Sequence, residues 1–168
     1  MRKMICLLAL FLFAFSGCSE EESTEKMVEA KSEIKDVVIF TDDGEKTKEA
    51  AKEICQMIDA QIVDYKKLEE KDLNQLLETT ELVLLGAQEE NQKFFDDMDM
   101  LLHLENMENK RVSLFFVGEE KDLLSWEGRV KKQDKIQLTP TFCMTGEKDR
   151  KTDEKNRMRG WLTTAFTY

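Results

Sequence analysis

Histidine occurs once in this sequence, at position 103, near the end of a predicted helix. One isolated imidazole argues against a histidine-based metal site and against a Ser-His-Asp triad. Cysteine is also sparse: there are four, and none of them forms a Cys-x-x-Cys pair or a cluster with the histidine. The sequence therefore offers neither a typical zinc site nor a dithiol redox motif. Cys55 and Cys143 lie inside apolar patterns, which predicts two separate buried thiols rather than a disulfide.

Positive charge is in the minority. Lysine and arginine number 25 against 35 aspartates and glutamates, and the formal net charge is -10. Binding to nucleic acid depends on basic residues that neutralise phosphates, so we expect no nucleic-acid partner. A chain this acidic should not adhere to anionic lipid head groups either, unless it carries an anchor.

Long hydrophobic runs are absent except for one at the N-terminus. Arg2 and Lys3 precede an unbroken apolar stretch, residues 4–15. A helix needs roughly 20 apolar residues to span a bilayer, so this stretch is too short for that. Its length and its basic flank are typical of the hydrophobic region of an export signal.

The end of that stretch resembles a lipobox, the cleavage and lipidation motif of bacterial lipoproteins. Ser16-Gly17-Cys18 has the small-Gly-Cys order, although Phe15 stands where leucine is usual, and an acidic run follows. The resemblance implies that residues 1–17 are a removable signal peptide. It also implies that Cys18 is acylated, with palmitate among the acyl chains, and anchors an exported protein to a bacterial membrane outside the cytoplasm. The alternative is an ordinary signal peptide that is cleaved elsewhere.

Cleavage before Cys18 removes Arg2 and Lys3 and no acidic residue, so the net charge falls by two, from -10 to -12. Residues 18–35 then comprise the lipidated cysteine and a charged spacer with few apolar side chains, typical of a solvated segment. The remainder, residues 36–168, has the length of one domain.

Within that domain, short apolar runs alternate with amphipathic segments. The runs are rich in β-branched and aromatic residues and predict strands, whereas the amphipathic segments have apolar residues at helical spacing. The predicted strands span residues 37–41, 61–65, 81–86, 111–118 and 135–144. The predicted helices span residues 45–58, 68–79, 90–104, 122–132 and 153–166.

This alternation predicts an α/β fold, a doubly wound five-stranded parallel sheet with helices on both faces. Strands that are covered on both faces lose their polar alternation, as these runs do. Pro140 interrupts the last strand and favours an edge position, because proline cannot donate to a neighbouring strand.

Ligands of open parallel sheets bind at the carboxyl ends of the strands. Three loops are predicted to leave those ends, at residues 41–47, 86–91 and 118–122. The first loop leads through Gly44 into a helix, and the backbone N–H groups at a helix N-terminus attract anions.

The first of these loops carries a family resemblance. Residues 41–50, TDDGEKTKEA, resemble the phosphate loop of flavodoxins, Thr/Ser-x-Thr-Gly-x-Thr-x-x-x-Ala. Leu84-Leu85-Gly86, the strand that ends at Gly118, and the final segment with Gly146-Glu147 and a helix containing Trp161 are also similar to that family. The resemblance implies a flavodoxin-like fold that binds FMN and transfers electrons.

The resemblance further implies where FMN would lie. The backbone amides of residues 42–47 would hold the phosphate, and the other two loops would flank the flavin ring. The implied cofactor-binding residues are Thr41, Asp42, Asp43, Gly44, Glu45, Lys46, Thr47, Gly86, Ala87, Gln88, Gly118 and Glu119.

The phosphate loop departs from the family pattern at two positions. Asp43 and Lys46 replace hydroxyl residues, and Thr47 lies one place late. A carboxylate close to a phosphate costs about 4 kcal/mol per pair of charges at an effective dielectric of 20. Neither of the other two loops contains an aromatic residue that would stack on a flavin.

Two functions therefore stay open. The first is a membrane-tethered, FMN-binding electron carrier with an unknown redox partner. The second is a flavodoxin-like binding module at the cell surface that has lost its cofactor. Its acidic loop residues would favour a basic protein partner or a cation such as Ca²⁺. These residues are Asp42, Asp43, Glu45, Glu89, Glu90, Glu119 and Glu120.

A thioredoxin-like fold is a weaker alternative. Thr139-Pro140-Thr141-Phe142 resembles the proline segment that begins a strand in that family. The Cys-x-x-Cys expected after the first strand is absent, and five parallel strands exceed what that topology uses.

Overall fold

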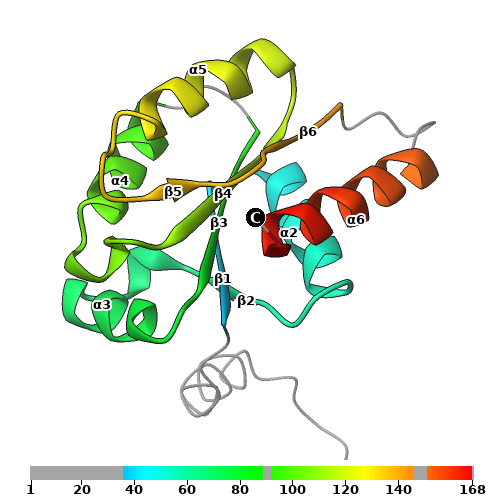
Figure 1. The fold of residues 1–168 in the computed structure, drawn as a ribbon. Coiled ribbons are helices and arrows are strands. Elements are labelled where there is room, and N and C mark those ends of the chain that lie inside the picture. The colour runs from blue at the N-terminus through cyan, green and yellow to red at the C-terminus, as the bar shows by residue number, and fades with distance from the viewer. Residues whose placement is uncertain (1–35, 89–91, 146–150, 168) are drawn as a thin grey trace, which may run out of the picture. The chain divides into compact units, whose positions relative to one another are not determined.

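The structure, a computed structural model, describes residues 36–88, 92–145 and 151–167. The predicted signal peptide, Cys18, the spacer, Glu89, Glu90 and Gly146-Glu147 lie outside these residues. From Asp36 onward, strands and helices alternate along the chain (Figure 1).

A parallel sheet forms the centre of the domain. Its order is β2-β1-β3-β4-β5, and β6 also pairs with β4. All pairings are parallel. The predicted α/β doubly wound fold is therefore confirmed. The strands are β1 (Val37–Thr41), β2 (Gln61–Val63), β3 (Leu82–Ala87), β4 (Arg111–Val117), β5 (Gln137–Leu138) and β6 (Phe142–Met144).

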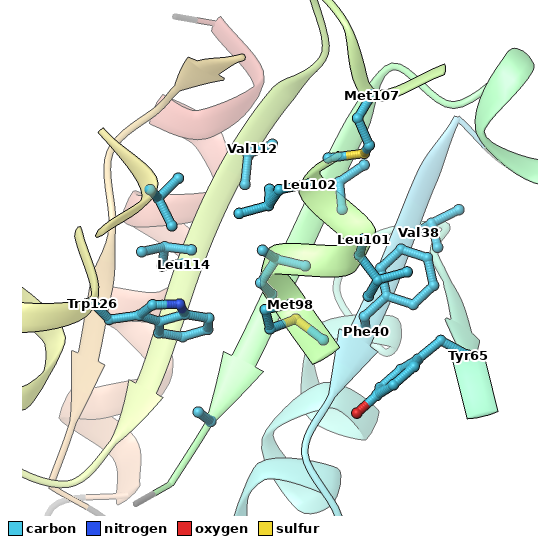
Figure 2. Packing of buried hydrophobic residues seen from close by; sticks show 14 of the residues in the cluster. Val38, Phe40, Tyr65, Met98, Leu101, Leu102, Met107, Val112, Leu114 and Trp126 are labelled. Atoms are coloured by element: carbon cyan, nitrogen blue, oxygen red, sulfur yellow. The ribbon is translucent and has the colours of Figure 1, made fainter. Parts of the chain in front are cut away.

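Helices cover both faces of the sheet (Figure 1). One face packs against α2 (Glu45–Cys55) and α6 (Lys151–Thr167), and the other packs against α3 (Glu70–Glu78), α4 (Gln92–Leu102) and α5 (Glu120–Val130). We call the two cores the α2–α6 core and the α3–α5 core, after the helices that cover them. Figure 2 shows the α3–α5 core, in which Met98, Leu101 and Trp126 cover residues of the sheet. Because both faces are covered, β3 is buried along its whole length, which accounts for its unbroken apolar sequence.

Most helix boundaries lie close to the predicted ones. The exception is α2, which ends at Cys55 rather than Ile58, where hydrogen bonds from Met57 and Ile58 to the Ile54 carbonyl close a turn. After β2, the chain enters a short 3₁₀ turn, Tyr65–Lys67, which the sequence pattern assigned partly to the strand. A second 3₁₀ turn, Glu105–Met107, follows α4.

The last predicted strand is divided in two by Pro140. The pieces on either side, β5 and β6, both pair with β4, so the expected edge position is confirmed. The Pro140 carbonyl accepts hydrogen bonds from the hydroxyl of Ser113 and from the indole of Trp161. These two side chains satisfy the backbone carbonyl at the break between β5 and β6.

Cys55 and Cys143 are half-buried and not joined by a disulfide. They pack against opposite faces of the sheet, Cys143 beside the α3–α5 core and Cys55 beside the α2–α6 core. The predicted separation of the two thiols is therefore confirmed. Within the described residues, no helix combines the length and the apolar character needed to cross a bilayer.

Candidate functional site

The carboxyl ends of β1 and β3 lie side by side and bring two of the predicted loops together. Thr41, the last residue of β1, is in register with Gly86 of β3. The next backbone N–H, of Asp42, donates to the Gly86 carbonyl at 3.0 Å and extends the pairing by one residue. The loop before α2 and the segment after β3 therefore begin in direct contact.

The carboxylate of Asp42 points inward at this junction. Asp42 is 5% exposed. Its Oδ1 accepts the N–H of Gly44 at 3.1 Å, and its Oδ2 accepts the N–H of Gln88 at 2.9 Å. One buried carboxylate thus bridges the two loops through backbone amides.

The Gln88 side chain makes a second contact between the same two loops. Its side-chain oxygen accepts the backbone N–H of Lys46 at 3.0 Å, in the first turn of α2. The same side chain lies against Gly44, where an added Cβ would come within 2.3 Å of the Gln88 Cδ. A side chain at position 44 would therefore displace the Gln88 side chain. We call these contacts the Asp42–Gln88 latch: the two side chains with the amides of Gly44, Lys46 and Gln88.

The third predicted loop reaches the same junction. Gly118 follows β4, and an added Cβ there would lie 3.3 Å from the Gln88 carbonyl oxygen and 2.6 Å from the ring of Phe116. Its N–H donates to Met144 of β6 at 2.8 Å. The structure therefore brings the three loops of the sequence prediction together, at least through their described residues. Glu119 lies farther out, exposed and paired with Lys121 at 2.7 Å.

Asp43, the residue expected to repel a phosphate, faces away from this junction. Its side chain is 73% exposed, forms an ion pair with Lys66 and lies 3.6 Å from Lys48. The hydrogen bond from Lys66 lowers the pKa of Asp43, and the same bond raises the pKa of Lys66. The buried acid is therefore Asp42, at the position where the family pattern places no required residue.

Beside this ion pair lies a residue that the sequence analysis did not connect with the site. The hydroxyl of Tyr65 donates to the Asp97 carboxylate of α4 at 2.9 Å, and its ring packs edge-on against Phe40 at 6.3 Å. Burial is the first cause that raises the pKa of Tyr65 above its usual range, and Asp97 adds to it. One signal in the sequence could have connected Tyr65 with the site: Tyr65 follows the end of β2 by two residues, and β2 is the neighbour of β1.

The other predicted site residues divide into exposed and buried groups. Glu45 and Lys46 are exposed on the first turn of α2, whereas Thr47 is fully buried there. The Thr47 hydroxyl has no hydrogen-bond partner among the described residues. Gly86 and Ala87 belong to β3, and Ala87 is part of the α3–α5 core rather than of a loop.

The predicted cation alternative gains no support from the described residues. Among them, no group of three or more histidine, cysteine, aspartate or glutamate side chains is arranged to hold a metal ion. Asp43 and Glu119 instead pair with lysines.

The junction fits the phosphate of FMN poorly. Four N–H groups at a helix N-terminus lack partners within the helix. At the N-terminus of α2, the side chains of Asp42 and Gln88 already accept two of these groups, the N–H of Gly44 and the N–H of Lys46. The Asp42 carboxylate also places negative charge where the resemblance would place the phosphate. Electrostatics therefore oppose the anion as long as Asp42 stays in this position.

Comparison with solved structures identifies the fold. An archaeal flavodoxin superposes with a TM-score of 0.54 and 12% identity, covering 77% of this chain and 97% of its own. The two-electron reduced flavodoxin of Megasphaera elsdenii gives 0.53 and 19%, covering 76% and 98%. The rubredoxin:oxygen oxidoreductase of Desulfovibrio gigas gives 0.52 and 14%, covering 86% of this chain but 39% of its own.

These likenesses show that the fold is flavodoxin-like, and at these identities they show the fold alone. No protein-family model matches the sequence, and a comparison with curated proteins finds no match either. The parallel sheet with order β2-β1-β3-β4-β5 also excludes the thioredoxin-like alternative.

Proposed function

We propose that this chain is a lipid-anchored, flavodoxin-like module that binds a protein partner outside the cytoplasm and does not use a flavin. The observation that carries the proposal is the Asp42–Gln88 latch, which satisfies amides at the N-terminus of α2 with side chains of the protein itself. A fold alone does not determine function, and a flavodoxin-like fold serves a binding role equally well.

The charge of the protein suggests the chemistry of the partner. Cleavage before Cys18 would lower the net charge by two, from -10 to -12, and Glu45 is exposed on the first turn of α2. A complementary, basic protein surface is attracted by such a field, which chiefly raises the rate of association. Because exposed charges are screened by salt, the affinity should fall as ionic strength rises.

An FMN-binding electron carrier is the second candidate. Two of the solved structures that share the fold are flavodoxins, and this chain keeps glycines at positions 44, 86 and 118. The buried Thr47 hydroxyl, which has no partner among the described residues, also favours a ligand near the first turn of α2.

Flavin uptake separates the two candidates. The full chain, solubilised in detergent, is incubated with excess FMN, desalted, and its absorbance recorded from about 300 to 550 nm. A binding module leaves the spectrum featureless. Flavin bands that persist through desalting would overturn the proposal and establish the electron carrier.

The anchor needs its own test, because it rests on the lipobox resemblance of Ser16-Gly17-Cys18. Detergent phase partitioning is compared between the wild type and Cys18→Ala, produced in a bacterial host, with mass spectrometry of the mature N-terminus. We expect the wild type in the detergent phase with an acylated Cys18, and the variant in neither state. Cys6→Ala, in the predicted signal peptide, is the matched control and should leave lipidation unchanged. An unmodified Cys18 would exclude the anchor.

A further inference from the structure

We infer that Asp42 and Gln88 act together as an internal substitute for an anion, and that removing both side chains opens a site for a phosphate monoester. The inference rests on the proposed function, since it explains why this loop does not hold a flavin phosphate. It goes further because it names the two side chains that fill the anion site, and because it predicts which class of ligand that site would bind without them.

The first step of the argument concerns the donors. A helix N-terminus combines unsatisfied N–H groups with the positive end of the helix dipole, the combination that binds phosphate in many proteins. α2 has eleven residues and begins at Glu45 after Gly44. The acceptors that occupy its first N–H groups are a carboxylate oxygen of Asp42 and a carboxamide oxygen of Gln88. Both are oxygens, as a bound phosphate would supply.

The second step concerns the origin of these acceptors. The Gln88 side chain comes from the far side of the junction, 42 residues along the chain from the amide of Lys46 that it caps. In return, Asp42 accepts the N–H of Gln88 itself, 46 residues away. The Asp42 contact with Gly44 is local, two residues apart, as in an ordinary helix cap. The Gln88 contact with Lys46 and the Asp42 contact with the Gln88 N–H are long-range, and they tie the two loops together.

The third step concerns space and charge. The Gln88 side chain lies directly on Gly44, so its removal uncovers the backbone of the turn. Removing Asp42 takes away the only buried carboxylate of this loop among the described residues. The neighbouring Asp43 is already paired with Lys66 and Lys48, which reduces its repulsion of an anion.

The test compares D42A/Q88A with the wild type and with a matched control, E70A/Q75A. The control removes one exposed carboxylate and one exposed glutamine from α3, which takes no part in the latch, so its net charge equals that of the test variant. Isothermal titration of the full chain in detergent uses inorganic phosphate and FMN as separate probes. Inorganic phosphate reports the anion site alone, whereas FMN also requires room for the flavin.

We expect D42A/Q88A to bind inorganic phosphate at least about tenfold more tightly than the wild type and the control. Equal phosphate affinity in all three proteins would overturn the inference while leaving the proposed function intact. Uptake of FMN by the wild type would overturn the proposed function instead. The two failures are therefore distinguishable.

A second measurement covers the case in which D42A/Q88A does not fold. Amide hydrogen exchange is followed in the wild type and in the single variant Q88A. Loss of the side-chain acceptor should speed exchange at Lys46 by about tenfold or more, while Lys48, whose N–H donates to the Gly44 carbonyl within the helix, stays protected. Unchanged exchange at Lys46 would show that Gln88 does not occupy this donor, and would overturn the inference.

Discussion

The ring of Phe115 lies on the backbone of Gly86, its partner on the neighbouring strand. The two residues are in register between β4 and β3. A Cβ added at Gly86 would come within 2.1 Å of the Phe115 Cζ, a distance that no ordinary packing permits. The Phe115 ring continues to Trp161 of α6, with ring centroids 6.2 Å apart. Gly86 therefore has a packing role in the α2–α6 core, and its role in a flavin loop stays a prediction.

This contact predicts the cost of filling Gly86. Gly86→Ala should destabilise the fold by about 1–3 kcal/mol, because the buried ring must shift to admit a methyl group. Gly160→Ala in α6 is the matched control, since nothing lies within 4 Å of a Cβ added there. It should stabilise the protein by about 0.5–1 kcal/mol through helix propensity. Urea unfolding measures both, and a neutral G86A would contradict the packing role.

Thr47 and Thr80 form a second matched pair, because both are almost fully buried and differ in their hydrogen bonds. The Thr80 hydroxyl donates to the Leu76 carbonyl at 2.9 Å, whereas that of Thr47 has no partner among the described residues. Thr47→Val should therefore be neutral or stabilising by up to about 1 kcal/mol, and Thr80→Val should cost about 1 kcal/mol. Equal costs in thermal or urea unfolding would mean that the Thr47 hydroxyl is satisfied in solution.

The contact between α6 and β4 yields a third prediction. The indole Nε1 of Trp161 donates to the Ser113 hydroxyl at 3.0 Å and to the Pro140 carbonyl at 2.7 Å. Ser113→Ala leaves the second acceptor in place and should cost at most about 1 kcal/mol. Trp161→Phe loses the donor and part of the buried ring, and should cost about 2 kcal/mol or more. A serine substitution as costly as the tryptophan substitution in urea unfolding would contradict this order.

The ion pair between Asp43 and Lys66 predicts a dependence on pH. Lys66 lowers the pKa of Asp43 below 3.8, so this part of the stability is present above about pH 4 and is lost as pH falls through the folded-state pKa. Asp43 raises the pKa of Lys66 above 10.5, so the same contribution is lost as pH rises through that higher value. Between these limits it should stay constant.

Its magnitude should be small, because Asp43 is largely exposed and solvent screens the pair. A double-mutant cycle with D43N and K66M near pH 7 should give a coupling free energy of about 0.2–1 kcal/mol. In about 1 M salt or towards pH 2, the coupling should disappear. A coupling that persists in acid would assign the interaction to packing of the two side chains rather than to their charges.

Much of the fold could be predicted from the sequence, since the apolar runs that became β1, β3 and β4 are each nearly or wholly buried. Continuous burial on two faces is a local property of composition, and alternation with amphipathic helices then restricts the topology. The three loops at the carboxyl ends of the strands followed from the same reasoning. Their meeting around Gln88 confirms that part of the prediction.

The sequence predicted only part of the division of the last strand. Pro140 marked an interruption and an edge, but the pairing of both pieces with β4 depends on Ser113 and Trp161, whose side chains bind the Pro140 carbonyl from other elements.

The sequence by itself determined the sheet, its helical layers and the location of the loops, because these follow from the spacing of apolar residues along the chain. Only the tertiary structure decided which of two adjacent aspartates is buried. Asp42 and Asp43 are identical in chemistry, and the amide of Gln88 and the ammonium of Lys66 distinguish them. Those partners lie 46 and 23 residues away, so the pattern of neighbouring residues could not predict them.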